Sequence, residues 1–310
     1  MKPTLFSLSL GGRALDVHAY GFMVAVGAAL GVILVVRLGR RAGYATNALL
    51  DLCFWTLVAG IAGSRLLYVL VHARDYAGLC FASDGRRSWG RVLSDCAAPL
   101  ALWNGGLVFY GGALASAAVL WVFARRQRWN TGDVADLLAP ALALGHVFGR
   151  LGCLLAGCCY GKPCDFGLRF PPGSVAYNEW MAQGLLAKDA TLTPPLAPTQ
   201  IYEALGEALI FAVLMLLRRR RRFPGALVLT YAMAYALLRF TVEIFRGDAA
   251  RGYLFELPLP FLARGLGLPP TQPLALSTAQ ALSLVLGGLA ATIFYRWRAH
   301  QAPSPDPPLR

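Results

Sequence analysis

The sequence predicts an all-α integral membrane protein with seven transmembrane helices. Hydrophobic residues make up 57% of the 310 residues and charged residues only 15%, and the mean hydropathy is +0.53. Soluble domains contain about 25% charged residues, so a chain this apolar is expected to place much of its surface in lipid. The net charge of +13 suits anionic lipid, and no stretch resembles a nucleic-acid-binding module.

Seven apolar runs are long enough to cross a bilayer, which takes about 20 helical residues. In chain order they cover residues 20–38, 49–73, 106–124, 133–157, 200–217, 224–245 and 277–296. Arginine clusters follow the first, third, fifth and seventh runs, whereas the segments after the other runs mix acidic and basic residues. Because basic residues are retained in the cytoplasm, we expect an outside N-terminus and a cytoplasmic C-terminus.

Two long segments separate the apolar runs on the outer side. Residues 74–104 and 158–199 are expected to form a small periplasmic head, and the second is rich in Pro and Gly. Long unstructured loops of this kind are often lids or binding elements. Residues 301–310 are Pro-rich and are expected to be a disordered tail, which leaves residues 1–300 as a single transmembrane domain.

Three arginines lie inside or at the end of apolar runs, namely Arg65, Arg150 and Arg239. An ionised guanidinium at membrane depth costs several kcal/mol unless it faces a hydrated or counter-charged cavity. Its planar fork also suits bidentate binding of phosphate. We interpret the three as the lining of a cavity that holds a phosphate headgroup. The alternative is that each pairs with a buried carboxylate or extends from a helix end toward water.

The first three cysteines are explained without special chemistry. Cys53 lies within an apolar run, where a thiol packs like a small apolar side chain. Cys80 and Cys96 bracket an outward segment, so an oxidising compartment would allow them to form a disulfide. Reduced thiols are the equal alternative.

Four further cysteines cluster at the outer end of the fourth apolar run. Their spacing is C-x4-C-C-x4-C, which is no standard zinc spacing, so packing or a second disulfide is favoured over metal and no metal site is predicted. A reactive thiol at Cys158 or Cys159 is a further alternative, because Arg150 is close enough in sequence to lower a thiol pKa. The four are Cys153, Cys158, Cys159 and Cys164.

Six ordered sequence stretches carry a family resemblance over about residues 20–296. Together with the seven-run layout, the chain resembles the prolipoprotein diacylglyceryl transferase family of bacterial inner-membrane enzymes. The stretches are Tyr20-Gly21, Trp103–Gly112, Gly149–Gly152, Pro198–Glu203, Arg239–Arg246 and Leu276–Gln280.

The resemblance implies transfer of the diacylglyceryl group of phosphatidylglycerol to the thiol of a lipobox cysteine in a preprolipoprotein, with release of glycerol 1-phosphate. It implies the bacterial inner (cytoplasmic) membrane, a site toward the periplasmic side, membrane lipid as a partner and no cofactor. The implied catalytic residues are Arg150, Arg239, Tyr110 and Glu243. The implied substrate-binding residues are Tyr20, Arg65, Gly105, Gly106, Gly161, Gln200, Tyr202, Glu203, Tyr235 and Arg246.

This chain departs from the family pattern at the site. Tyr110 stands where the F-H-G-G motif has a histidine that is proposed to act as base, and Cys153 replaces the asparagine of G-R-x-G-N. The acidic residue a few positions later is replaced within Gly157–Gly161, and Ala197 replaces the histidine before P-T-Q. Tyr110 is the first candidate to take the proton from the acceptor thiol, with Cys158 or Cys159 as the rival.

Other functions stay open at this point. The chain could be a paralogue that moves a glyceryl or lipid group to another acceptor. An anionic-lipid transporter or a lipid-binding protein would also place arginines within the membrane. A transporter is expected to show matched repeats with broken helices, and no such repeat is evident in the sequence.

Overall fold

The computed structural model describes residues 4–10, 13–76, 96–100, 106, 108–248, 253–257 and 274–300. The chain divides into two compact units. The first comprises Met1–Val35 and Ala135–Arg310, and the second comprises Val36–Val134. The expected disordered tail at 301–310 and most of the segment at 74–104 lie outside the described residues.

Six helices within the described ranges are long and apolar enough to cross a membrane. Large apolar side chains are exposed along them, for example Ile61 at 53%, Leu205 at 66% and Leu237 at 70%. Such exposure is unfavourable in water and natural in lipid, so the protein is a multi-pass membrane protein. The six are α1 (Ala19–Arg41), α2 (Thr46–Val71), α6 (Thr131–Ala156), α8 (Thr199–Leu217), α9 (Ala226–Phe245) and α11 (Thr278–His300).

The remaining expected span is α5 (Phe109–Arg126), which is helical but is not among these six. It has 18 residues and ends in Arg125 and Arg126. Each of the seven predicted runs thus coincides with a helix of the described residues to within a few residues, and six of these helices meet the length and hydropathy needed to span a membrane.

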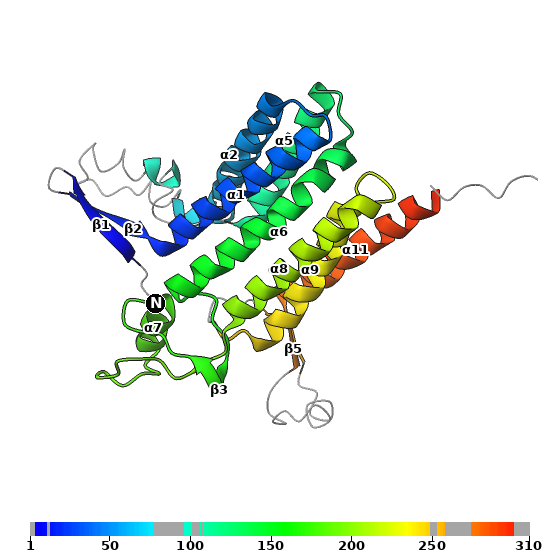
Figure 1. The fold of residues 1–310 in the computed structure, drawn as a ribbon. Helices are drawn as coiled ribbons and strands as arrows, with labels where there is room; N and C mark the ends of the chain where they lie inside the picture. The colour runs from blue at the N-terminus through cyan, green and yellow to red at the C-terminus, as the bar shows by residue number, and fades with distance from the viewer. Residues whose placement is uncertain are drawn as a thin grey trace, which may run out of the picture. The chain divides into compact units, whose positions relative to one another are not determined.

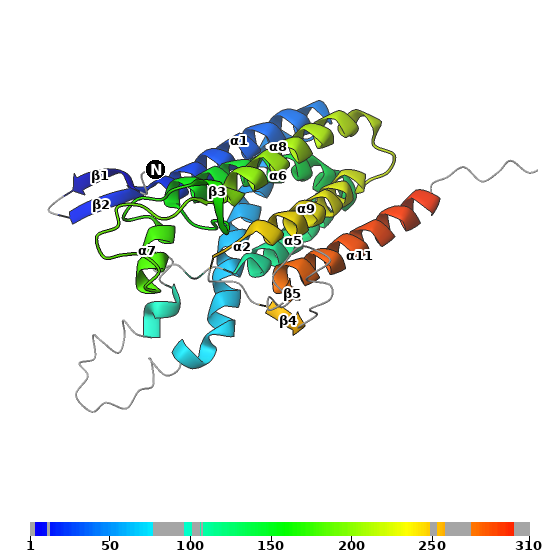
Figure 2. The same cartoon turned by 90° about the horizontal axis from the view of Figure 1, so that it is seen from below.

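In the first unit, α8, α9 and α11 run side by side, and α9 lies between the other two (Figures 1 and 2). The N-terminal part of α1 packs closely on α6. A Cβ added to Gly27 would lie 2.8 Å from Phe148 Cβ and 3.2 Å from the Gly145 carbonyl oxygen. Small residues at such positions allow the close approach on which helix packing in lipid depends.

In the second unit, α2 and α5 pack against each other through glycines. A Cβ added to Gly112 would lie 2.6 Å from the Gly60 carbonyl oxygen, and one added to Gly111 would overlap the Gly63 carbonyl oxygen. Gly111 and Gly112 are therefore the points at which α2 approaches the α5 backbone, and α2 fills the space beside them.

The segment 158–199 is not the unstructured loop that its Pro and Gly content suggested. It contains β3 (Pro163–Leu168) and α7 (Val175–Ala182), whose first turn is capped by Ser174. A small apolar cluster of Tyr160, Phe170, Ala176 and Leu196 is buried within it. This packing gives the segment a core of its own.

The sequence did not predict the short strands of the first unit. Thr4–Leu10 (β1) pairs antiparallel with Arg13–His18 (β2), and Tyr253–Leu257 (β4) pairs with Leu274–Ser277 (β5). The described residues also form two 3-10 turns, η1 (Ala98–Leu100) in the second unit and η3 (Arg218–Arg220) in the first.

A buried carboxylate on α6 fixes the start of α9. Asp136 is 2% exposed, and its two oxygens accept hydrogen bonds from the amides of Gly225, Leu227 and Val228 at 2.8–3.0 Å. Arg221 Nη1 lies 3.5 Å from the same carboxylate. The amides at the start of α9 therefore find their acceptor on another helix rather than in a local cap.

Replacing Asp136 by alanine should destabilise the protein by about 1–3 kcal/mol, because buried backbone amides lose their acceptor. Thermal unfolding in detergent would measure the loss. Asp51→Ala, at an exposed position on α2, is the control and should change stability little. Equal unfolding temperatures for the two variants would show that Asp136 does not hold α9.

Candidate active site

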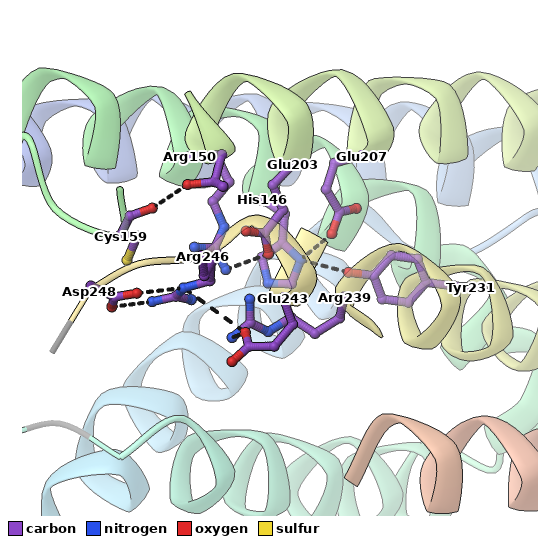
Figure 3. Close-up of polar contacts among 11 residues, drawn as sticks. His146, Arg150, Cys159, Glu203, Glu207, Tyr231, Arg239, Glu243, Arg246 and Asp248 are labelled. Carbon is purple, nitrogen blue, oxygen red and sulfur yellow. Dashed lines mark hydrogen bonds and ion pairs between the residues drawn. The ribbon is translucent and has the colours of Figure 1, made fainter. Parts of the chain in front are cut away.

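Three arginines pair with buried carboxylates in the first unit (Figure 3). Arg150 Nη2 on α6 lies 2.7 Å from Glu203 Oε1 on α8. Arg239 Nη2 lies 2.7 Å from Glu243 Oε2, one turn along α9. Arg246, at the end of α9, binds Asp248 through two hydrogen bonds of 2.9 and 2.5 Å.

Glu243 links two of the pairs, those of Arg239 and Arg246. Its Oε2 also lies 4.0 Å from Arg246 Nε, and its side chain is only 3% exposed. One carboxylate thus faces two guanidinium groups. Glu243, which the family resemblance implies to be catalytic, thus contacts Arg239 closely and lies near Arg246.

An arginine that only neutralises a buried carboxylate would also form such a pair. Donors that the carboxylates leave unused therefore distinguish an anion-binding site from a structural ion pair. Arg150 uses one of its two terminal nitrogens for Glu203, and its side chain keeps 19% exposure. Within the described part of the chain, the buried Nη1 of Arg239 has no hydrogen-bond partner. A buried donor without an acceptor costs free energy, and an anion bound beside it would remove that cost.

A second polar group lies one turn deeper. His146 Nδ1 lies 2.9 Å from Glu207 Oε1 and 2.8 Å from the Tyr231 hydroxyl, as Figure 3 shows. Tyr235 stacks on Tyr231 with ring centroids 6.0 Å apart. The side chain of Glu207 is 1% exposed. Buried ionisable groups at membrane depth mark a functional region by default.

Sequence reasoning missed His146 and Glu207, although both carried a signal. His146 is four residues before Arg150, and Glu207 is four residues after Glu203. Residues four apart share one helix face, so the two pairs could have been matched across α6 and α8. Asp248 gave a weaker signal, as an acidic residue two positions after Arg246.

Three chain segments cross at Gly161, and this crossing positions the site. The Gly161 amide donates to the Ala197 carbonyl at 2.9 Å, the Lys162 amide to the Phe245 carbonyl at 2.8 Å and the Gly247 amide to the Tyr160 carbonyl at 3.1 Å. A Cβ at Gly161 would lie 2.6 Å from Ala197 Cβ and 2.8 Å from the Phe245 oxygen. Gly161, predicted to bind substrate, has this structural reason to be glycine.

Residues of the P-T-Q motif hold the turn that follows α6. Thr199 Oγ1 donates to the Cys159 carbonyl at 2.6 Å, and Gln200 Nε2 donates to the Cys158 carbonyl at 2.8 Å. Gln200 is 1% exposed. Both motif residues thus bind the backbone beside the site rather than project away from it.

Three cysteine sulfurs converge in this turn. The sulfur atoms of Cys153, Cys158 and Cys159 all lie within 4.8 Å of one another. Hydrogen bonds from the Cys153 and Cys158 thiols lower the pKa of the Cys159 thiol, and Arg246 and Arg150 lower it further. Of the alternatives that the sequence left open, a second disulfide is not formed: Cys153, Cys158, Cys159 and Cys164 are all free.

Two aromatic residues that were predicted to bind substrate, Tyr20 and Tyr202, lie on α1 and α8 in the first unit. Tyr20, in the first turn of α1, packs on α6 so closely that a Cβ at Gly152 would lie 3.2 Å from its ring. Tyr202 on α8 makes an edge-to-face contact with Phe245, with ring centroids 6.0 Å apart. Tyr20 is 47% exposed.

The second unit contains the other predicted residues, and Arg65 has a clear role there. Its guanidinium donates to the carbonyls of Pro99 and Gly106 at 2.8 and 3.1 Å and to the Tyr76 hydroxyl at 3.3 Å. Gly106 has φ +74°, and a Cβ there would lie 2.5 Å from Tyr68 Cζ. Arg65 therefore positions the chain before α5.

Two further predictions fall in the same unit. Tyr110 lies in the first turn of α5 and is 44% exposed, whereas Gly105 lies outside the described residues. Cys96 is disulfide-bonded, as one of the two alternatives expected. Its predicted partner, Cys80, is also outside the described residues.

Comparisons with known proteins agree on one family. The sequence profile described as prolipoprotein diacylglyceryl transferase matches residues 4–296. The phosphatidylglycerol–prolipoprotein diacylglyceryl transferase of Clostridium tetani is 30% identical over 80% of this chain and 86% of its own length. The enzyme of that name from Xanthomonas oryzae pv. oryzae is 32% identical over 86% of this chain and 90% of its own length. The chain belongs to the prolipoprotein diacylglyceryl transferase family.

Proposed function

We propose that this protein transfers the diacylglyceryl group of phosphatidylglycerol to the thiol of a lipobox cysteine in a prolipoprotein, releasing glycerol 1-phosphate. The observation that carries the proposal beyond family membership is the paired arginine group, in which Arg239 Nη1 is buried without an acceptor among the described residues. Arg150 and Arg239 would bind the phosphate of the lipid. Glu203 and Glu243 would hold the two guanidinium groups in place.

The reaction is an alkylation at carbon with phosphate as leaving group. The acceptor sulfur forms a bond to the glyceryl carbon while the bond from that carbon to the phosphate oxygen breaks. The electron pair goes to the phosphate oxygen, and the proton of the acceptor thiol ends on the departing glycerol 1-phosphate or in solvent. Arginines already placed beside that oxygen stabilise its developing charge without reorganisation.

The direct test uses the purified full-length chain with phosphatidylglycerol and a peptide that carries a lipobox cysteine. Mass spectrometry should detect a diacylglyceryl adduct on that cysteine and an equal amount of glycerol 1-phosphate. A peptide with serine in place of the cysteine should receive no adduct. Movement or retention of the lipid without any adduct would instead support a transporter or a binding protein.

We also propose that the chemistry lies on the periplasmic side of the bacterial inner membrane, with α5 as the seventh span. The arginine clusters along the sequence support this, since Arg40 and Arg41 end α1, Arg125 and Arg126 end α5, and Arg218–Arg220 follow α8. Residues 158–199 would then form the periplasmic head, within a single transferase domain over residues 1–300.

This topology predicts opposite labelling at two points of the chain. A reporter fused after Arg298 should be cytoplasmic, and one inserted near the exposed Lys188 should be periplasmic, because basic clusters stay in the cytoplasm. A membrane-impermeant reagent that labels the reporter on intact cells would read both positions. Labelling at Arg298 without labelling at Lys188 would reverse the topology.

Tyr110 enters the proposal through its place in the family motif alone. We expect its hydroxyl to donate one hydrogen bond to the lipid headgroup, so Tyr110→Phe should lower transfer about tenfold, or about 1.4 kcal/mol in the barrier. The pH profile of the remaining activity should be unchanged. A shifted profile would identify Tyr110 as the base instead. Tyr295→Phe, at an exposed position on α11, is the control.

A further inference from the structure

The convergence of three free cysteines beside the arginine pairs is not explained by packing. Cys153 lies in the last turn of α6, and Cys158 and Cys159 follow that helix, with all three sulfurs within 4.8 Å of one another. We propose that Cys153, Cys158 and Cys159 bind a thiophilic divalent metal ion of the zinc class, with a fourth coordination position left open.

The sulfur spacing suits such an ion. Tetrahedral zinc binds thiolates at about 2.3 Å, which places neighbouring sulfurs about 3.8 Å apart. The sulfurs are already within 4.8 Å of one another, so movements of individual side chains would close the remaining gap. Three protein ligands and an open position are the arrangement found where zinc takes part in chemistry rather than only in folding.

The backbone brings the sulfurs together before any metal binds. Gly157 has φ +74° and Cys159 has φ +57°, so the chain turns back on the end of α6. The Cys158 amide donates to the Cys153 carbonyl at 3.1 Å. Thr199 and Gln200 donate hydrogen bonds to the carbonyls of Cys159 and Cys158, respectively. A left-handed conformation at a non-glycine residue such as Cys159 is uncommon and costs free energy.

A disulfide explains the arrangement less well than a metal. A disulfide would use two of the three sulfurs and leave the third without a role, and all three are free thiols here. Spacing in the sequence argued against zinc, because C-x4-C-C matches no standard motif. The turn at Gly157–Cys159 removes that objection, since it places the three sulfurs together in space.

The open position would take the thiolate of the acceptor cysteine, a role that rests on the proposed function. A thiol that coordinates zinc loses its proton, which supplies the nucleophile without a histidine. Three thiolates and a divalent ion carry a net negative charge, and Arg150 and Arg246 lie close enough to Cys159 to interact with it electrostatically. The metal would thus take over the role of the family's histidine, which Tyr110 replaces in this chain.

The site is tested first by metal content. Full-length protein purified in detergent under reducing conditions, then incubated with zinc and desalted, should retain about one zinc ion per chain. Cobalt added in place of zinc should give a thiolate-to-cobalt charge-transfer band. The triple variant Cys153→Ser, Cys158→Ser, Cys159→Ser should retain at least tenfold less zinc and show no such band.

Two controls separate metal binding from misfolding and oxidation. Cys164→Ser changes a free cysteine of the same segment that lies outside the cluster, and it should bind zinc like the wild type. The thermal unfolding of the metal-free triple variant should match that of the metal-free wild type. Wild-type protein that is reduced and folded yet retains no more zinc than the triple variant would overturn the proposal, as would a disulfide within the cluster in protein isolated from cells.

Transfer activity gives the second, independent measurement. Removal of the metal by a chelator should lower transfer to the lipobox peptide at least tenfold, and zinc should restore it. Full transfer by metal-free protein would overturn the role of the metal while leaving the transferase function intact. Zinc bound at the cysteines of a protein without any transferase activity would support the metal site but overturn the transferase function.

Discussion

Alanine in place of Arg150 or Arg239 is expected to lower diacylglyceryl transfer by about 100–1000-fold. Removal of one preorganised donor to a developing oxyanion has an effect of this size, and each guanidinium presents donors that its carboxylate partner leaves unused. Lysine keeps the charge but loses the planar fork, so Arg150→Lys and Arg239→Lys should lower transfer at least about tenfold.

Initial rates with phosphatidylglycerol and a lipobox peptide would measure this effect. Arg41→Ala removes an exposed arginine at the end of α1 and should leave the rate unchanged. The phosphate-binding proposal predicts that the loss falls on the chemical step as well as on lipid binding. Wild-type rates in both alanine variants would rule out the arginine pairs as the headgroup site.

The second large effect is expected on stability, from Glu243→Ala. Its carboxylate is buried and faces Arg239 at 2.7 Å and Arg246 at 4.0 Å. Truncation leaves a buried guanidinium without its counter-charge, which typically costs about 3–5 kcal/mol. Glu243→Gln keeps an oxygen acceptor and should cost less.

Thermal unfolding in detergent would measure the loss, with Asp189→Ala at an exposed position as the control. The double variant Glu243→Ala, Arg239→Ala should recover part of the stability, because it removes the orphaned charge together with its partner. If the double variant is less stable than Glu243→Ala by the full effect of Arg239→Ala, the two residues are independent and the pair is not a unit.

The helices were predictable because lipid imposes a simple rule on the sequence. About 20 apolar residues are needed to cross the bilayer, and the runs that satisfied it became α1, α2, α5, α6, α8, α9 and α11 within a few residues of their expected ends. The pairing of Arg239 with Glu243 was predictable for a similar reason, since residues four apart on a helix lie on one face.

Contacts between distant segments were not predictable in this way. From the sequence, Asp136 is an ordinary polar residue within an apolar run. Its hydrogen bonds to the amides of α9 depend on the packing of α6 against α9, which the sequence does not show. The sulfurs of Cys153, Cys158 and Cys159 converge because of the positive φ angles at Gly157 and Cys159. The spacing of cysteines in a sequence does not predict such angles. The strands and α7 are too short for hydrophobic periodicity to distinguish them from loops. The Pro-rich composition of 158–199 predicted an unstructured loop, whereas the segment contains a strand and a helix.

The capping of α9 by Asp136 has a consequence for the order of assembly in the membrane. Translation delivers α6 well before α9, so the acceptor for the three amides is already in the bilayer when the α8–α9 hairpin follows. Without this carboxylate the buried amides at the start of α9 would lack an acceptor, at a cost of about 1–3 kcal/mol. Because α6 is inserted first, the Asp136 carboxylate is already in place to accept hydrogen bonds from the amides of α9 when that helix inserts. The same carboxylate thus serves both assembly and the final structure.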